Sequence, residues 1–337
     1  MIVGVYSDFR NPPAWRRGWS THYGATLDRL CEAERLGCGS IWLSEHHLFE
    51  DGYLPQPLVM AAAVAARTST ARIGTAVFLP GLRPAIDTAE QAAVVDQLSG
   101  GRLDLGLGFG YRIPEFEIYG REVRGRYETV EERIVEIRRL WDEGICTPPP
   151  AQSRLPIWLG ATGPRGARMA GRLGEGLLWL DDALLEPYRE GLVAGGHDPA
   201  TARMTGLVNL VLADDPDAAW ARIAPHLAYQ RDSYNRYGAE GRERGTMTAS
   251  RTLQPGSGAV DVEALRGPAR QALPPAFDVV TPAEAIRRLT AWLSPLPVEQ
   301  IYLWESVAGM PDDLADRHVE LVATHLAPAL AGVGITT

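Results

Sequence analysis

The segment most informative about the architecture is Leu98-Ser-Gly-Gly-Arg-Leu-Asp-Leu-Gly-Leu-Gly-Phe-Gly-Tyr111, which follows a helical pattern over 84–98. Bulky side chains at every second position alternate with Asp104 and glycines, so one face of this run packs and the other is bare. The glycines resemble a dinucleotide-binding GxGxxG fingerprint, but Tyr111 stands at its last position and a loop follows. We therefore predict a buried strand here and reject a Rossmann site.

The same alternation of short apolar runs and amphipathic stretches extends along the chain and forms about eight βα units. This rhythm predicts a (β/α)8 TIM barrel, with a doubly wound open sheet as the structural alternative, because periodicity does not distinguish a closed sheet from an open one. The expected strands are 2–6, 40–44, 73–79, 103–109, 157–161, 176–180, 206–212 and 300–304, and the expected helices 27–33, 56–67, 84–98, 130–141, 165–172, 281–292 and 312–326.

The rhythm breaks at about 226–280, where Gly, Pro, Arg and Ser residues cluster. We interpret this region as an insertion before the last βα unit of a single domain that covers residues 1–337. Its arginine-rich part, 231–251, is expected to form either a lid or a solvated loop.

Composition excludes several classes of function. All 33 basic residues are arginine, which excludes a lysine Schiff base or a P-loop lysine. The net charge of −9 comes without a basic run, so neither nucleic acid nor an anionic membrane is an expected partner. Cys31, Cys38 and Cys146 form no CxxC pair, and no apolar run is long enough to span a bilayer. Because a strand pattern begins at the first residue without a signal-like segment, we expect a cytoplasmic protein.

A polar motif, Ser44-Glu45-His46-His47, follows the second predicted strand, at the end of a barrel where enzymes of this fold place their chemistry. Alternation directs Glu45 and His47 to one side and His46 to the other. Adjacent histidines on opposite sides, with the other histidines scattered, disfavour a metal site, and we expect no metal. A hydrogen-bonded polar cluster that caps the strand is the alternative to a catalytic role.

Two more strand ends have the composition of a ligand site. Small residues within 73–80 would let a flat ring lie close to the backbone. The turn Trp158-Leu-Gly-Ala-Thr-Gly-Pro-Arg165 leads from a strand into a helix, so its N–H groups and the helix dipole suit a phosphate. A plain βα turn, with glycines for geometry only, is the alternative interpretation.

Together these segments resemble the bacterial-luciferase-like superfamily of flavin-dependent monooxygenases. The resemblance rests on Trp42-Leu-Ser-Glu-His-His47, Gly74-Thr-Ala-Val77 and the run from Ala89 to Tyr111, followed by Glu115-Phe116 and Tyr119-Gly120, and it is strong over 1–180 and moderate over 281–328. It implies a barrel that takes reduced FMN from a separate flavin reductase and uses O2 to oxidise a small organic substrate. By analogy with the family we expect a homodimer, and residues 229–234 to belong to a mobile active-site segment.

The resemblance also implies roles for individual residues. His46 assists the flavin chemistry, with Glu45 beside it, and the flavin ring lies against a non-proline cis peptide at Ala76-Val77. The family has a phosphate-binding arginine near the end of the fourth strand, where this chain has Phe109, and Arg112 or Arg165 would have to substitute. The implied cofactor-binding residues are Thr75, Ala76, Val77, Phe109, Arg126, Ala161, Thr162 and Gly163.

Three other functions remain as alternatives. The first is hydride transfer with the deazaflavin F420 in the same barrel. The second is a flavin-binding homologue without turnover, suggested by Phe109 at the expected arginine position. A metal hydrolase is a more distant third.

Overall fold

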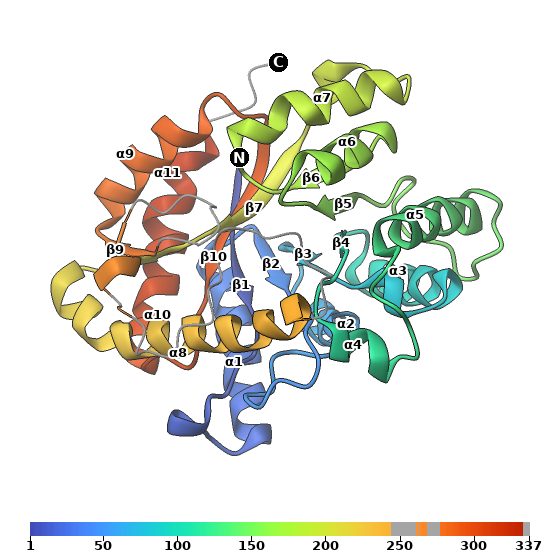
Figure 1. Ribbon diagram of the computed structural model, residues 1–337. Helices are drawn as coiled ribbons and strands as arrows, with labels where there is room; N and C mark the ends of the chain where they lie inside the picture. The colour runs from blue at the N-terminus through green and yellow to red at the C-terminus, as the bar shows by residue number, and fades with distance from the viewer. Residues whose placement is uncertain (244–260, 262, 268–276, 333–337) are drawn as a thin grey trace.

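The computed structural model describes residues 1–243, 261, 263–267 and 277–332, and its centre is a closed barrel of eight parallel strands in the order β1-β10-β7-β6-β5-β4-β3-β2 (Figure 1). The pairing of β1 with β10 closes the sheet, which excludes the open doubly wound alternative. The strands are β1 (Ile2–Ser7), β2 (Ser40–Leu43), β3 (Arg72–Thr75), β4 (Leu103–Gly108), β5 (Ile157–Gly160), β6 (Gly176–Leu178), β7 (Met204–Val208) and β10 (Val298–Trp304).

Helices surround the barrel, as the predicted (β/α)8 architecture requires (Figure 1). The predicted start of α9 is confirmed, because the Thr281 hydroxyl accepts a hydrogen bond from the N–H of Glu284. Within the described ranges, no helix combines the length and apolar character that a membrane crossing requires. The helices are α1 (Trp19–Leu36), α2 (Pro57–Arg67), α3 (Ala85–Ser99), α4 (Ile113–Ile118), α5 (Arg126–Asp142), α6 (Pro164–Arg172), α7 (Leu185–Ala194), α8 (Pro216–Glu243), α9 (Pro282–Leu293), α10 (Asp312–Leu321) and α11 (Ala327–Ala331).

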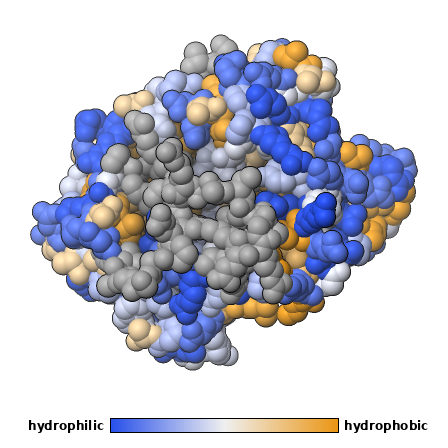
Figure 2. All heavy atoms as spheres, in the orientation of Figure 1, coloured by the Kyte–Doolittle hydropathy of each residue, from blue (hydrophilic) through white to orange (hydrophobic). Residues whose placement is uncertain are grey.

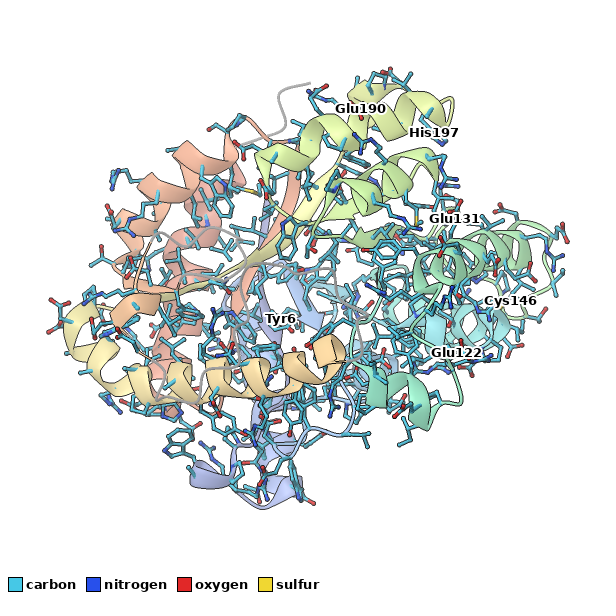
Figure 3. All side chains as sticks on the ribbon, in the orientation of Figure 1. Tyr6, Glu122, Glu131, Cys146, Glu190 and His197 are labelled. Carbon is cyan, nitrogen blue, oxygen red and sulfur yellow. The ribbon has the colours of Figure 1, made fainter. Side chains whose placement is uncertain are left out.

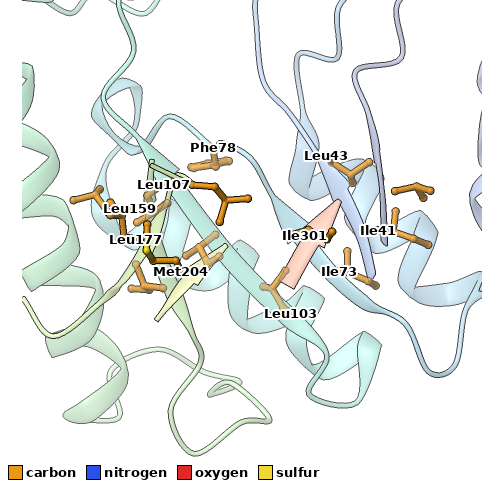
Figure 4. Packing of buried hydrophobic residues seen from close by; sticks show 14 of the residues in the cluster. Ile41, Leu43, Ile73, Phe78, Leu103, Leu107, Leu159, Leu177, Met204 and Ile301 are labelled. Atoms are coloured by element: carbon orange, nitrogen blue, oxygen red, sulfur yellow. The ribbon is translucent and has the colours of Figure 1, made fainter. Parts of the chain in front are cut away.

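The main hydrophobic core lies between the barrel and its helices. Side chains that point outward from the strands, such as Ile41, Ile73 and Leu107, pack in this layer and are fully buried (Figure 4). The predicted packing face of β4 is confirmed, since its three leucines belong to this core. Apolar helix positions such as Leu30 and Ile134 complete the layer from outside.

Large aromatic rings fill the inside of the barrel. Trp42 and Tyr302 stack with ring centroids 4.6 Å apart. Gly74 makes room for them, because a Cβ at this position would lie 2.2 Å from the Trp42 ring. The bare backbone at Gly74 therefore accommodates an indole of the chain itself, whereas the sequence suggested an approach for a ligand ring.

The structure corrects two predicted strands. β3 ends at Thr75 and does not reach residue 79, with only an isolated bridge between Phe78 and Leu107 beyond it. The predicted strand 206–212 is divided at Asn209 into β7 and β8 (Leu210–Leu212), and β8 leaves the barrel to pair with β9 (Asp278–Val280). The Asn209 side chain accepts a hydrogen bond from Trp304 Nε1, which anchors the change of sheet.

The predicted insertion begins inside a helix. Helix α8 starts at Pro216 and continues through the expected boundary near 226 to Glu243, with Pro225 inside it. It covers the first part of the arginine-rich segment, whereas 244–251 lie outside the described residues. The tyrosines of α8 contact the segment that follows β2, so this helix crosses the carboxyl end of the strands. In the space-filling view, hydrophilic side chains dominate the described surface around it (Figure 2).

Candidate active site

His46 lies just beyond the end of β2, with its side chain 14% exposed. Its Nδ1 atom is 2.7 Å from Glu115 Oε1, and an ionised carboxylate only accepts, so Nδ1 carries the hydrogen in this pair. Three aromatic rings surround the imidazole, with centroids 4.9 Å (Phe49), 4.7 Å (Tyr53) and 5.6 Å (Tyr111) away. The arrangement leaves Nε2 as the atom for proton exchange with a bound molecule.

Glu115, on the short helix α4, holds this imidazole and had no role in the sequence prediction. Its Oε1 also accepts the backbone N–H of His47 at 3.0 Å. Burial acts to raise the pKa of Glu115, but His46, the N–H of His47 and the Arg112 guanidinium together keep that pKa below its ordinary value. The carboxylate therefore stays ionised. Nothing in the sequence indicated that Glu115 contacts His46, although Glu115 belongs to a segment on which the family resemblance rests.

Glu45, which the resemblance places beside His46 in the reaction, contacts His47 instead. One of its oxygens lies 2.8 Å from His47 Nε2, and the other accepts the backbone N–H of Leu79 at 2.7 Å. The Arg83 guanidinium forms an ion pair with it at 2.7 Å. The predicted separation of the two histidines is thus confirmed, and Glu45 fixes the loops after β2 and β3.

Ala76 and Val77 follow β3 and form a partly exposed apolar platform, with the backbone N–H of Ala76 donating to Leu43 O at the end of β2. The peptide bond between them is cis, as the resemblance implied. The side chain of Val77 lies so close to the backbone of β4 and β5 that only glycine fits at positions 108 and 160. A Cβ at Gly108 or Gly160 would lie 2.2 or 2.6 Å from the methyl groups of Val77. Thr75 differs from the prediction: it is fully buried, and its hydroxyl donates to Gly106 O and accepts from Gly106 N, so it has a structural role.

The proposed phosphate turn lies after β5. Ala161 is buried, Thr162 is exposed, and Gly163 is the residue before the first turn of α6. No side chain caps this helix, and a Cβ at Gly163 would meet nothing within 4 Å. The backbone N–H groups at the start of α6 therefore face an open approach, which suits an anion.

Phe109 occupies the position of the family's arginine and is packed against protein. Its ring stacks on Tyr127 with centroids 4.1 Å apart. The guanidinium of Arg165 lies 4.4 Å from the same tyrosine ring, and that of Arg126 lies 5.2 Å from it. Arg112 instead donates to the backbone oxygen of His47. Of the two expected substitutes, Arg165 is therefore the one that lies near the phosphate turn.

These residues follow four neighbouring strands, β2 to β5, so the barrel brings them to one end. Among the side chains that the structure describes, no three His, Cys, Asp or Glu residues are arranged to hold a metal ion.

Curated relatives of known activity match part of the chain. An F420-dependent glucose-6-phosphate dehydrogenase from Amycolatopsis mediterranei is 33% identical over 199 residues, 52% of this chain and 59% of the relative. An F420-dependent hydroxymycolic acid dehydrogenase from Mycobacterium tuberculosis is 34% identical over 233 residues, 60% of this chain and 64% of the relative. The alignments thus span less than two thirds of either relative.

The fold is shared along almost the whole chain with a solved monooxygenase. RslO1 from Streptomyces bottropensis superposes with a TM-score of 0.76 at 24% identity, covering 97% of this chain and 99% of that one. The model of the luciferase-like monooxygenase family matches residues 1–295. A match of this extent shows that the chain belongs to the luciferase-like monooxygenase family.

Proposed function

We propose that this chain is a monooxygenase that uses reduced FMN and O2 to oxidise a small organic substrate, with His46 as the proton-exchanging group. The observation that carries the proposal is the imidazole fixed by Glu115 at the carboxyl end of the barrel, between aromatic rings. A histidine exchanges protons readily near neutral pH, and the rings limit the access of water.

The residues at this end of the barrel fit FMN. The partly exposed Ala76–Val77 platform offers an apolar surface to a flat ring, and the uncapped start of α6 offers N–H donors to a phosphate. Reduced FMN would supply the two electrons that reduce one oxygen atom of O2 to water while the other enters the substrate. Ala76 and Val77 would hold the ring, and Thr162, Gly163 and Arg165 the phosphate.

The charge pairs around α6 leave Arg165 available to a phosphate at little cost. Arg165 pairs with Glu128 at 2.5 Å, and further along α6 two more arginines pair with Glu131 and Glu190, which Figure 3 labels on α5 and α7. One exposed pair costs little to open, at most about 1 kcal/mol.

Titration with anaerobically reduced FMN, followed by turnover under 18O2 with a flavin reductase and a panel of small organic compounds, tests the proposal. We expect saturable binding and incorporation of one 18O atom into product. In His46→Ala, binding of reduced FMN should stay within about tenfold while product formation falls by about 10² or more. His325→Ala, an exposed histidine far along the chain, is the matched control. Turnover that survives in His46→Ala would contradict the role of this residue.

Hydride transfer with F420 is the second candidate, favoured by the two curated relatives. The Nε2 atom of His46 would then accept the proton of a substrate alcohol. Parallel anaerobic titrations with F420 and reduced FMN separate the two: F420 binding together with alcohol oxidation in the absence of O2 would replace the first proposal. Binding of either coenzyme without any turnover would indicate the non-catalytic homologue.

The proposal also includes a separate flavin reductase, a homodimer and a cytoplasmic location. Sedimentation of the purified chain tests the dimer. Reconstitution with an unrelated NADH-dependent flavin reductase tests whether reduced FMN can arrive by diffusion. A requirement for one particular reductase would contradict a diffusible cosubstrate.

A further inference from the structure

The hydroxyls of three tyrosines form a hydrogen-bonded chain, and the middle one, Tyr53, is the residue whose ring faces His46. The Tyr53 hydroxyl lies 2.9 Å from that of Tyr6 on β1 and 3.1 Å from that of Tyr234 on α8. The ring of Tyr53 stands perpendicular to the His46 ring, with centroids 4.7 Å apart. Tyr6 packs with Trp42 and Tyr302 inside the barrel, and Figure 3 labels it next to α8 in that view. The chain therefore runs from the barrel interior to a helix that crosses its mouth.

The guanidinium of Arg10 packs against the same rings. Its Cζ atom lies 4.4 Å from the Tyr53 ring centroid and 4.7 Å from that of Tyr234. The side chain is fully buried and pairs with Asp8 at 3.3 Å and Asp51 at 3.2 Å. Its Nη2 atom is buried and has no hydrogen-bond partner among the described residues, and such a donor is costly to leave unpaired.

The tyrosine chain has one hydrogen to spare. Three hydroxyls supply three hydrogens, and the two bonds between them use two. Either atom in each bond can be the donor, so the chain can direct its spare hydrogen toward the Tyr234 end. Tyr234 is partly exposed, as are His46 and Tyr111, whereas Tyr53 is buried. The spare hydroxyl hydrogen can thus lie at a partly exposed place near the imidazole, whereas the Arg10 guanidinium is buried behind the tyrosine rings.

We propose that Tyr234, with the buried Arg10 guanidinium packed behind its ring, forms a substrate subsite beside His46, where its hydroxyl donates a hydrogen bond to the carbonyl or hydroxyl oxygen of a neutral aromatic substrate. The subsite rests on the proposed function, since it places that oxygen next to the group that exchanges protons.

The charges around Arg10 select a neutral molecule. Asp8 and Asp51 already flank the guanidinium, and burial raises the pKa of Asp8 to about 7, so this buried cluster already disfavours negative charge and an anionic substrate would add more of it. A carbonyl or hydroxyl oxygen accepts the same hydrogen bonds without this repulsion.

The rings around His46 select a flat molecule. Phe49, Tyr53 and Tyr111 surround the imidazole, and aromatic faces and edges pair favourably with further rings. A substrate that combines one ring with one acceptor oxygen can both pack against these aromatic rings and accept the hydrogen bond from Tyr234.

Calorimetric titration with three probes of similar shape tests the subsite without turnover. 1-Tetralone has a carbonyl on a fused ring, tetralin is the same framework without oxygen, and 1-naphthoate carries a negative charge. We expect 1-tetralone to bind about fivefold more tightly than tetralin, the ratio that one net hydrogen bond of about 1 kcal/mol gives. 1-Naphthoate should bind more weakly than 1-tetralone. Equal binding of 1-tetralone and tetralin, no binding of 1-tetralone, or tightest binding of 1-naphthoate would each overturn the proposal.

Tyr234→Phe removes the hydroxyl and keeps the ring. We expect it to abolish the preference for 1-tetralone over tetralin while the affinity for tetralin stays the same. Tyr237→Phe is the matched control on the same helix, because its hydroxyl is engaged with the backbone N–H of Glu50. The control should keep the fivefold preference. A preference that persists in Tyr234→Phe, or disappears in both variants, contradicts the subsite.

Titration of the same samples with reduced FMN and F420 separates the two proposals. Normal coenzyme binding without the 1-tetralone preference would contradict the subsite alone. An intact preference without binding of either coenzyme would contradict the proposed function alone.

Discussion

His46 and Glu115 are separated by 69 positions in the sequence, yet their contact determines which imidazole nitrogen can act on a substrate. Because the carboxylate accepts from Nδ1 and from the His47 backbone, both the ring orientation and the tautomer are fixed. Glu115 is thus a positioning residue for the proposed reaction.

Glu115→Gln keeps the size of the side chain but loses the charge that favours hydrogen at Nδ1. We expect turnover to fall about tenfold, within the range of general acid–base effects, with little change in KM. Nitrogen-15 NMR of the labelled protein should show a larger share of the Nε2–H tautomer of His46. Glu122→Gln, an exposed residue that follows α4, is the control. An unchanged tautomer would show that Glu115 does not position the ring.

Gly108 and Val77 should be coupled in a double-mutant cycle. A Cβ at Gly108 would lie 2.2 Å from a Val77 methyl carbon, so Gly108→Ala should destabilise the protein by about 1 to 3 kcal/mol through overpacking. Val77→Ala in the same chain removes that methyl group and should recover most of the loss. Urea unfolding of the four proteins measures this. Additive effects of the two substitutions would mean that the backbone moves away instead.

At the scale of elements, β8 and β10 depend on one buried imidazole. The backbone N–H of Leu212 donates to His318 Nδ1 at 2.8 Å, so the other nitrogen carries the hydrogen and donates to Trp304 O at 2.9 Å. Burial lowers the pKa of His318 from 6.5 to about 4, although both backbone hydrogen bonds oppose the shift. The neutral ring is therefore the form that joins the outer two-stranded sheet to the barrel through α10.

The His318 shift makes stability depend on pH. Because the unfolded chain takes up the proton below about pH 6.5 and the folded chain only near pH 4, stability should rise with pH across this window. Between pH 8 and pH 5 the contribution is about 2 kcal/mol. His318→Gln should be less stable at pH 8, and its further loss at pH 5 should be about 2 kcal/mol smaller than in the parent. Urea unfolding at both pH values checks this, and equal losses would contradict it.

At the scale of the whole molecule, the barrel was predictable because its strands are short apolar runs bounded by turns. The division at Asn209 was not, since 206–212 is one apolar run and only its distant partners, β9 and β10, decide which sheet each half joins. Helix α8 was missed because Pro225 and polar residues conceal it. At the candidate site, the resemblance pointed to His46 and Ala76–Val77, whereas the Arg10 cluster comes from segments that only the fold brings together.

Because the chain contains no lysine, and so no side-chain amine to modify, exhaustive acylation with an amine-reactive ester should leave its cofactor binding unchanged. We expect intact-mass spectrometry to find one added acyl group, at the amino terminus of the 337-residue chain, and unchanged binding of reduced FMN. Guanidinium-directed phenylglyoxal should abolish binding of the phosphate, which the proposal assigns to Arg165. Loss of FMN binding after acylation alone would contradict the assignment of the phosphate to arginine.

The hydrogen bonds between β1 and β10 join two strands that lie almost three hundred residues apart in the sequence. Until β10 has been synthesised, the incomplete barrel has two unpaired strand edges, and aromatic rings such as that of Trp42 lack Tyr302 as a stacking partner. A partly synthesised chain therefore exposes unpaired strand edges and apolar surface, and both favour aggregation.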